Sequence, residues 1–150
     1  MFIVPVTKGD ADLFRRMLVE YWRDLVPDAP WLQDPILAEA HFKDRYRWDG
    51  GGKNPFWALV DGRRVGFFMV RIYEDDVTAY IHDFFIDAVA RRQGLGTEMF
   101  RELLSLLQNR GIVRINLSVL ADNPVALNFW REQGFEIAYH RLTKFVDSVE

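Results

Sequence analysis

The sequence predicts a single α/β domain over residues 1–150, in which a mixed central β-sheet is flanked by about four helices. Three observations predict this fold class. First, segments rich in β-branched and aromatic residues alternate with segments of helical spacing, in the order β-α-α-β-β-β-α-β-α-β. Second, the middle β-α-β unit requires two parallel strands, whereas the hairpin before it is antiparallel. Third, 150 residues suit one domain with a sizeable core.

The first half of the chain predicts a strand, two helices and a hairpin. Residues 2–6 read as the strand. Asp10 is the expected N-cap of a helix that ends at Pro27, and residues 28–35 read as a proline-rich loop. A second helix is expected over 35–48, and residues 56–73 as a hairpin turning at Asp61–Gly62. The apolar positions of the first helix are Leu13, Phe14, Met17, Leu18, Tyr21, Trp22 and Leu25.

The second half predicts three strands and two helices. Residues 77–89 form a strand, and a helix closed by Gly111 follows the hexapeptide "RRQGLG". Residues 112–120 form the next strand. Asn123 is the N-cap of a short helix, with Pro124 in its first turn and Gly134 after its end. Residues 135–146 read as the last strand. The helix after the hexapeptide carries one apolar stripe of Met99, Phe100, Leu103, Leu104 and Leu107.

Composition excludes several classes of function. The formal charge of -3 gives no general attraction to nucleic acid or anionic lipid. The chain has no cysteine, so disulfides, thiolate nucleophiles and cysteine-ligated zinc are excluded, and no metal site is predicted. No apolar run is long enough to span a membrane, and "MFIVPVTKGD" does not resemble a secretory signal. We therefore expect a cytoplasmic protein.

The hexapeptide predicts a phosphate cradle. Glycines at 94 and 96 allow backbone N–H groups to approach an anion, and the positive end of the following helix favours one. The side chains of Arg91, Arg92 and Thr97 add charge and a hydroxyl. A P-loop is excluded because Gly-Lys-Ser/Thr is absent, and a dinucleotide fingerprint because Met99 stands where a small residue is needed. The alternative is that the glycines serve only a tight turn.

Two segments together resemble a known family. "RRQGLG" is similar to the (Gln/Arg)-x-x-Gly-x-(Gly/Ala) pyrophosphate loop of the GNAT family of N-acetyltransferases. "NPVALNFWREQGF" is similar to that family's Asn-x-x-Ala…Tyr…Gly-Phe segment, and the order of elements also matches. The resemblance covers nearly the whole chain and implies the GNAT acyl-CoA N-acyltransferase fold, with acetyl-CoA (coenzyme A) as the acyl donor.

The resemblance also implies site residues. The strand before the loop would part from the next strand, and the pantetheine arm would lie in the gap against Phe84, Phe85 and Ile86. A backbone N–H near Phe84 would polarise the thioester carbonyl. The remaining residues implied to bind the cofactor are Arg91, Arg92, Gln93, Gly94, Leu95, Gly96, Thr97, Asn123, Phe129 and Trp130.

The acceptor amine needs a base, because a free alkylamine is mostly protonated at neutral pH. Alternation on the strand predicts Tyr80, His82 and Phe84 on one face, and Ile81, Asp83 and Phe85 on the other. His82 is the first candidate for the base, and Tyr80 is the second. Asp83 binds a cationic substrate or forms an ion pair with an arginine.

Trp130 departs from the family pattern. It stands where many members have a tyrosine that protonates the departing thiolate, and an indole N–H is not a useful acid. The thiolate then leaves unaided or through water, or Tyr80 or Tyr139 replaces the missing acid. Alternatively, the protein binds acyl-CoA as a sensor without turning it over. A third class, a structural α/β domain, predicts no coenzyme A binding.

The acceptor is expected to be a small-molecule amine. "YIHDFFI" and "NFW" look most like the polyamine-type branch of the family, and the acidic stretch Glu74–Asp76 either attracts a cationic amine or is an ordinary solvated turn. Trp22, Trp31 and Trp48 are expected to wall the acceptor pocket. Amino acids, aminoglycosides, aromatic amines and protein N-termini stay open as acceptors. The edge of the last strand favours a homodimer.

Overall fold

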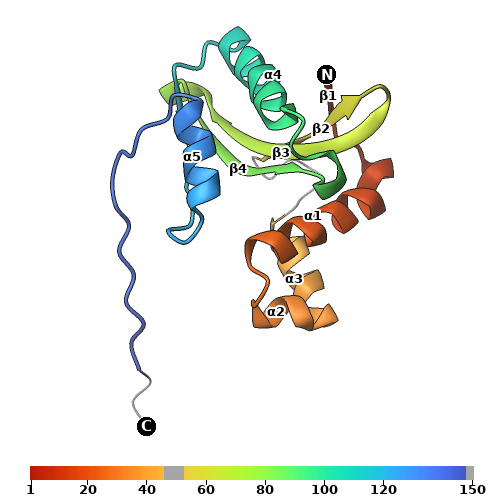
Figure 1. The fold of residues 1–150 in the computed structure, drawn as a ribbon, viewed down its shortest axis with the longest axis vertical. Helices are drawn as coiled ribbons and strands as arrows, with labels where there is room; N and C mark the ends of the chain where they lie inside the picture. Colours follow the sequence, from red (N-terminus) through yellow and green to blue (C-terminus); the bar gives the residue numbers. More distant parts are fainter. Residues whose placement is uncertain (46–52, 148–150) are drawn as a thin grey trace. The chain divides into compact units, whose positions relative to one another are not determined.

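The computed structural model describes residues 1–45 and 53–147, with the backbone alone at residues 44 and 45. It has the predicted mixed sheet, five-stranded in the order β1–β2–β3–β4–β5, with flanking helices (Figure 1). The elements fall into two compact units, Met1–Ser118 and Val119–Glu150, and the sheet belongs to the first. The strands are β1 (Phe2–Pro5), β2 (Asn54–Val60), β3 (Arg63–Tyr73), β4 (Thr78–Ile86) and β5 (Arg114–Asn116). The helices are α1 (Ala11–Leu25), α2 (Pro30–Gln33), α3 (Pro35–Arg45), α4 (Leu95–Asn109) and α5 (Pro124–Glu132), with 3-10 turns η1 (Lys8–Asp10), η2 (Glu74–Asp76) and η3 (Ala88–Ala90).

The strand directions agree with the sequence pattern. The pairs β1–β2, β2–β3 and β3–β4 are antiparallel. Strand β4 pairs parallel with β5, to which α4 connects it, as the β-α-β unit requires. The hairpin turns at Asp61 and Gly62, whose φ angles of 50° and 76° are both left-handed. Such a two-residue turn matches the twist of the flanking strands, which explains the Asp-Gly pair.

Helices cover both faces of the sheet (Figure 1). On one face lies α1, where the Phe14 ring centroid is 5.6 Å from that of Trp57 and 5.0 Å from that of Phe67. On the other face lies α4, which buries most of its predicted stripe. Strand β3 is therefore buried on both sides from Gly66 to Val70. Burial on both sides explains why β3 has apolar residues at successive positions, whereas a strand with one exposed face would alternate apolar and polar residues.

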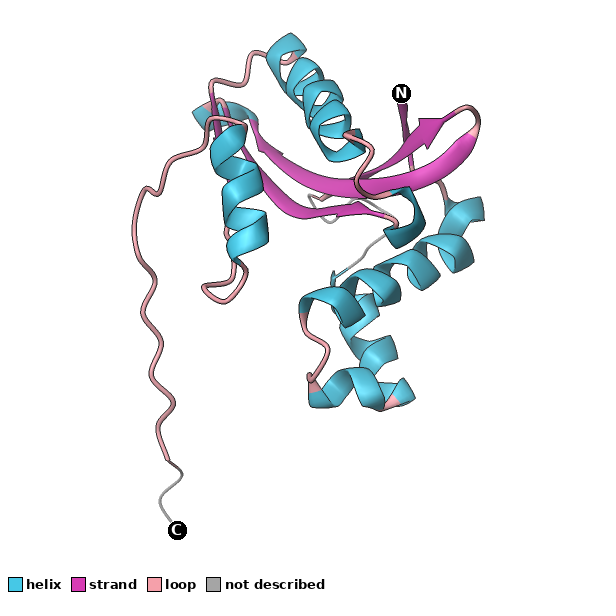
Figure 2. Ribbon diagram, viewed as in Figure 1, coloured by secondary structure: helices cyan, strands magenta, loops and turns pink. Residues whose placement is uncertain are grey.

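Three predicted elements differ from the structure. Of the strand expected over 112–120, only Arg114–Asn116 forms a strand, β5. Residues 30–33 of the expected loop form the short helix α2, because Pro30 has the φ that a first helical turn needs and Leu32 is buried below it. Residues 135–147 contain no strand, although 135–146 were expected to form one (Figure 2). A strand needs a hydrogen-bonded neighbour as well as a suitable pattern, and no described strand pairs with this segment.

Asp10 stands directly before α1, as expected, but its carboxylate does not cap that helix. It accepts hydrogen bonds from the Thr7 backbone N–H at 3.1 Å, from Trp57 Nε1 at 3.1 Å and from the Arg64 guanidinium at 2.9 Å. The bond from the Thr7 backbone, followed by that from Trp57, holds the pKa of the Asp10 carboxyl below its ordinary value. Asp10 thus joins the N-terminal turn to β2 and β3.

Candidate functional site

Strands β4 and β5 part early. Strand β5 pairs only Arg114, Ile115 and Asn116 with the first three residues of β4, which end at Tyr80. Strand β4 continues to Ile86, and no described strand pairs with it on that side beyond Tyr80. Beyond Tyr80 this side of β4 is therefore an edge among the described strands, and a sheet edge is where an extended ligand can pair as a strand would.

A β-bulge at His82 lies where the strands part. Asp83 pairs with Met69 of β3, and Ile81 pairs with the next residue, Val70, so His82 is an extra residue in β4. The bulge reverses the alternation that a regular strand would have. Because Met69 and Arg71 share a face of β3, their partners Asp83 and Tyr80 share a face as well.

The predicted faces of β4 are therefore wrong for three residues. Phe84 pairs with Phe68, so it lies on the face opposite to Tyr80 instead of beside it. Asp83 and Phe85 lie on the Tyr80 face, which α1 covers. The physical reason is the bulge, since one inserted residue shifts every later side chain to the other face.

The three candidate catalytic residues lie close together in this stretch. The Tyr80 and His82 rings are 4.8 Å apart between centroids, and His82 is half-buried. The Tyr80 hydroxyl is 2.5 Å from Ser118 Oγ, in the segment that follows β5. Asp83 is 5% exposed. Ser118 is not among the residues predicted from the sequence, and only its place just after the strand beside Tyr80 could have indicated it.

The predicted phosphate loop has left-handed backbone at two positions. Arg92 has φ 64° and Gly94 has φ 73°, and α4 begins at Leu95. A Cβ at Gly94 would meet no atom within 4 Å, so the glycine is needed for its φ and leaves the loop surface open. Among the described residues, the amides from Arg92 to Gly96 have no hydrogen-bond acceptor. These amides at the positive end of α4 form a concentration of free donors suited to an anion.

The two arginines of the loop differ in their surroundings. Arg91 Nε donates to the Ile86 carbonyl oxygen at 2.8 Å, and the guanidinium forms an ion pair with Asp24 of α1. The same guanidinium carbon lies 5.3 Å from the centroid of the Phe85 ring. Arg92 and Gln93 are exposed, and neither has an ion pair or hydrogen bond to the described residues.

An acidic group adjoins Arg91. Burial raises the pKa of the Glu20 carboxyl above its ordinary value, and the charge of Asp87 and a hydrogen bond with it add to the rise. The charge of Asp24 acts in the same direction, while Arg91 opposes it. The end of α1 and the end of β4 are thus coupled electrostatically.

In the second unit, the short helix predicted between Asn123 and Gly134 is confirmed as α5. The Oδ1 atom of Asn123 accepts from the Ala126 backbone N–H at 3.1 Å and caps it, as predicted. Trp130 is 7% exposed, with its ring centroid 4.8 Å from that of Phe129 and 5.3 Å from that of Phe135. These three rings form the apolar centre of the unit.

Two of the residues expected near the acceptor form an aromatic cluster with His41, which was not predicted. Trp22 of α1 lies 5.3 Å from Trp31 of α2 between ring centroids, and His41 of α3 stacks on Trp31 at 3.9 Å. Trp48 lies outside the described residues. The acidic stretch Glu74–Asp76 is the exposed turn η2.

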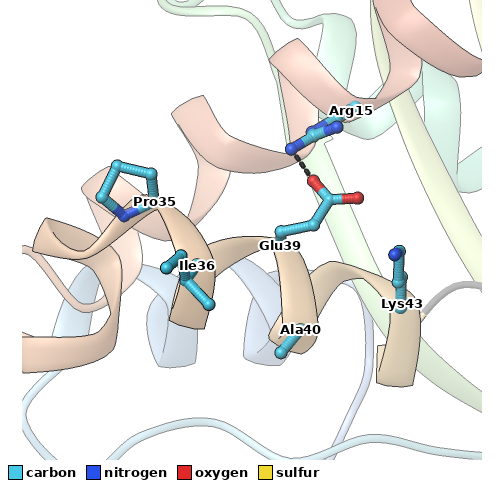
Figure 3. Close-up of a pocket in the computed structure, with 6 residues that line it drawn as sticks. All are labelled: Arg15, Pro35, Ile36, Glu39, Ala40 and Lys43. Carbon is cyan, nitrogen blue, oxygen red and sulfur yellow. Dashed lines mark ion pairs between the residues drawn. The ribbon is translucent and has the colours of Figure 1, made fainter.

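A surface hollow lies elsewhere, between α1 and α3 (Figure 3). An ion pair between Arg15 and Glu39 crosses it. None of the predicted site residues lines this hollow, and no cofactor role is assigned to it. Its lining residues are Arg15, Pro35, Ile36, Glu39, Ala40 and Lys43.

Neither a metal-binding cluster nor a membrane-spanning helix occurs in residues 1–45 and 53–147. No group of three or more His, Asp or Glu side chains in this part of the chain could hold a metal ion. No described helix has the length and apolar character to cross a membrane.

The profile of the Acetyltransferase (GNAT) family matches residues 14–135, so the chain belongs to this family of N-acetyltransferases, whose acyl donor is acetyl-CoA. Among curated proteins, it is 29% identical over 136 residues to the uncharacterized N-acetyltransferase MJ1207 of Methanocaldococcus jannaschii. The aligned residues cover 87% of this chain and 58% of that protein. It is 28% identical over 109 residues to the L-amino acid N-acetyltransferase AaaT of Escherichia coli, covering 71% of this chain and 67% of that one. The chain thus spans about three fifths to two thirds of the length of these relatives.

Solved structures have the same fold. One is an aminoglycoside acetyltransferase, meta-AAC0020, from an uncultured soil sample in complex with sisomicin, with a TM-score of 0.67 and 18% identity over 99% of this chain and 96% of that one. Another is AAC(6')-Iy in complex with a bisubstrate analog of CoA, with a TM-score of 0.69 and 16% identity over 98% of both chains. At this level of identity the likeness concerns the fold alone.

Proposed function

We propose that this chain is an acetyl-CoA-dependent N-acetyltransferase that transfers the acetyl group directly to a primary amine of a small molecule. The observation that carries the proposal is the early parting of β4 from β5, directly before a loop of free amides. The strand edge suits the amide-containing pantetheine arm, and the loop suits the pyrophosphate.

Specific residues would hold the donor. Phe84, Phe85 and Ile86 would line the thioester end, and the loop from Arg91 to Thr97 would hold the pyrophosphate. Asn123, Phe129 and Trp130 are assigned to the pantetheine border by the family pattern alone. When bound, acetyl-CoA supplies a thioester carbonyl that an amine can attack.

His82 is proposed as the base. It would take a proton from the acceptor ammonium, which frees the nitrogen lone pair for attack on the thioester carbonyl carbon. As the carbon–sulfur bond broke, the leaving sulfur would take a proton from the Tyr80 hydroxyl, which is bonded to Ser118 Oγ. The second proton of the acylated nitrogen would pass to the Tyr80 oxygen and restore the hydroxyl, so that the products are the N-acetyl amine and the free thiol. Tyr139 is 73% exposed in the second unit and is the weaker candidate.

The acceptor is proposed to be a cationic amine of the polyamine type. Buried Asp83 on the Tyr80 face and the aromatic cluster of Trp22, Trp31 and His41 support a site for a cation. The relative AaaT is named for L-amino acids, so an amino acid is the second candidate acceptor.

A homodimer is proposed as well, and a cytoplasmic location stays a prediction. In residues 135–147 several apolar side chains are exposed, among them Leu142 at 91% and Phe145 at 92%. A second copy of the chain would cover them. Sedimentation equilibrium tests this, since Leu142→Lys with Phe145→Lys should then dissociate the dimer, whereas a wild-type monomer would refute it.

An acyl-CoA sensor is the alternative function. It is favoured by Trp130, which is buried among Phe129 and Phe135 and supplies no acid. A sensor binds coenzyme A but releases no thiol with any amine, whereas a transferase does both.

Calorimetric titration with coenzyme A tests the binding part of the proposal. Gly94→Trp should abolish binding, because its side chain would stand over the free amides. Gly111→Trp is the matched control, since Gly111 has φ 76° and equally open space but lies at the far end of α4. Both variants carry a similar backbone strain. Equal affinity of the two variants would overturn the assignment of the loop.

A further inference from the structure

Arg91 is held by contacts within the protein, in contrast to its neighbour Arg92. Its Nε atom is bonded to the Ile86 carbonyl, its terminal nitrogen is paired with Asp24, and its plane lies near the Phe85 ring. Arg92 is exposed and has no ion pair with the described residues. Adjacent residues of the same type therefore have different surroundings.

The contacts of Arg91 join two parts of the proposed site. Phe85 and Ile86 belong to the stretch of β4 assigned to the thioester end, and Asp24 belongs to the last turn of α1. Helix α1 touches the same stretch through Tyr21, whose ring centroid is 5.6 Å from that of Phe85. Arg91 thus fixes the start of the loop to β4 and to α1 at once.

We infer that Arg91 is a positioning residue, which holds the phosphate loop in place through Asp24 and the Ile86 carbonyl, whereas Arg92 contacts the phosphate groups. The inference rests on the proposed function. It reassigns the first arginine of the loop from a source of charge to a mechanical link between α1 and the loop.

The pair is exposed enough to be tested without unfolding the protein. The side chains of Arg91 and Asp24 are 41% and 47% exposed. Ion pairs with this exposure contribute little to stability, because water and salt screen them. Substitutions should therefore change the position of the loop more than the stability of the fold.

The charge of Asp24 gives a test of opposite sign for the two roles. If Arg91 bound phosphate directly, Asp24→Asn would remove a competing carboxylate, and coenzyme A would bind equally well or more tightly. If Arg91 positions the loop, Asp24→Asn frees the guanidinium and coenzyme A binds more weakly. The direction of the change distinguishes the roles.

The experiment is calorimetric titration of the full chain with coenzyme A at two ionic strengths. We expect Asp24→Asn and Arg91→Gln each to raise the Kd about fivefold, and the double variant to show little further change because both break one link. Arg92→Gln should raise the Kd and also weaken its dependence on salt, since a screened charge is lost. Arg91→Gln should leave that dependence intact. Asp28→Asn, which removes an exposed charge just beyond α1, is the control and should match the wild type.

Three results would overturn the inference. They are tighter or unchanged binding in Asp24→Asn, additive effects in the double variant, and a salt dependence that Arg91→Gln lowers as much as Arg92→Gln does. Failure of the wild-type chain to bind coenzyme A would overturn the proposed function itself, and is distinguishable because it precedes any variant. Thermal melts of each variant exclude unfolding as the cause of weaker binding.

Discussion

Tyr80 and Asp83 point to the same face of the sheet although they lie three residues apart on one strand. A regular strand would place them on opposite faces. The extra residue between them, His82, makes the bulge that changes this. As a result, the hydroxyl of Tyr80, the imidazole of His82 and the buried carboxyl of Asp83 gather where β5 leaves β4.

Substituting His82 tests its role as the base. His82→Gln should lower kcat/KM about 10²- to 10⁴-fold, because an unaided ammonium must lose its proton to water. The variant should also change the pH dependence of kcat/KM, because the base must be deprotonated to act. Steady-state kinetics between pH 5 and pH 9 measure both effects. His140→Gln, at an exposed position in the second unit, is the control. A variant with the wild-type pH profile would exclude His82 as the base.

Asp10 should stabilise the fold in a pH-dependent way. Because its pKa is lowered in the folded state, its contribution is present above the ordinary value of 3.8 and is lost as the pH falls through the lowered pKa. Asp10→Asn should cost about 1–2 kcal/mol at pH 7 and less below pH 3.8. Urea unfolding at pH 7 and at pH 3 measures the difference. Asp12→Asn, an exposed change two residues further along the chain, should cost little at either pH. A cost for Asp10→Asn that is the same at both pH values would contradict this account.

The ionised carboxyl of Glu20 should destabilise the fold, in contrast to that of Asp10. Its pKa is raised in the folded state, chiefly by burial and then by Asp87, so its ionisation opposes folding as the pH rises above the ordinary value of 4.5. Glu20→Gln should therefore raise Tm at pH 7, and the gain should vanish at pH 4. Differential scanning calorimetry measures it. Destabilisation at pH 7 would show that the carboxylate makes a net favourable contact.

Gly66 is required by close packing of the backbone. A Cβ there would lie 2.2 Å from the Phe85 carbonyl oxygen, which a change of rotamer cannot relieve. Gly66→Ala should cost about 3 kcal/mol or more. Gly62→Ala provides the comparison, because its Cβ would meet no atom and only its φ of 76° is strained, at about 1–2 kcal/mol. Denaturant unfolding of both variants measures the loss of stability. An equal loss in the free energy of unfolding of the two variants would argue against a clash at Gly66.

Local signals in the sequence predicted much of the fold. The Asp61–Gly62 turn, the Asn123 cap and the parallel pairing of β4 with β5 follow from short-range backbone preferences and chain connectivity. The family pattern added an expected phosphate loop, and the structure has left-handed backbone at its Gly94.

What the sequence could not predict depends on distant contacts. The bulge at His82 arises from pairing with β3, which counting along β4 alone cannot detect. The pairing of Arg91 with Asp24 joins residues 67 positions apart. The strand expected over 135–146 has a suitable pattern but no described neighbour. Each difference comes from tertiary structure that local preference does not determine.

Thiol release from acetyl-CoA, followed with a thiol-reactive dye across a panel of amines, tests the central proposal most directly. The chain has no cysteine to react with the dye, so every signal comes from released coenzyme A. The account predicts release that depends on one class of amine, with polyamines before amino acids, and that is lost in Gly94→Trp. Tight binding of coenzyme A without release for any amine would contradict the transferase and leave the sensor.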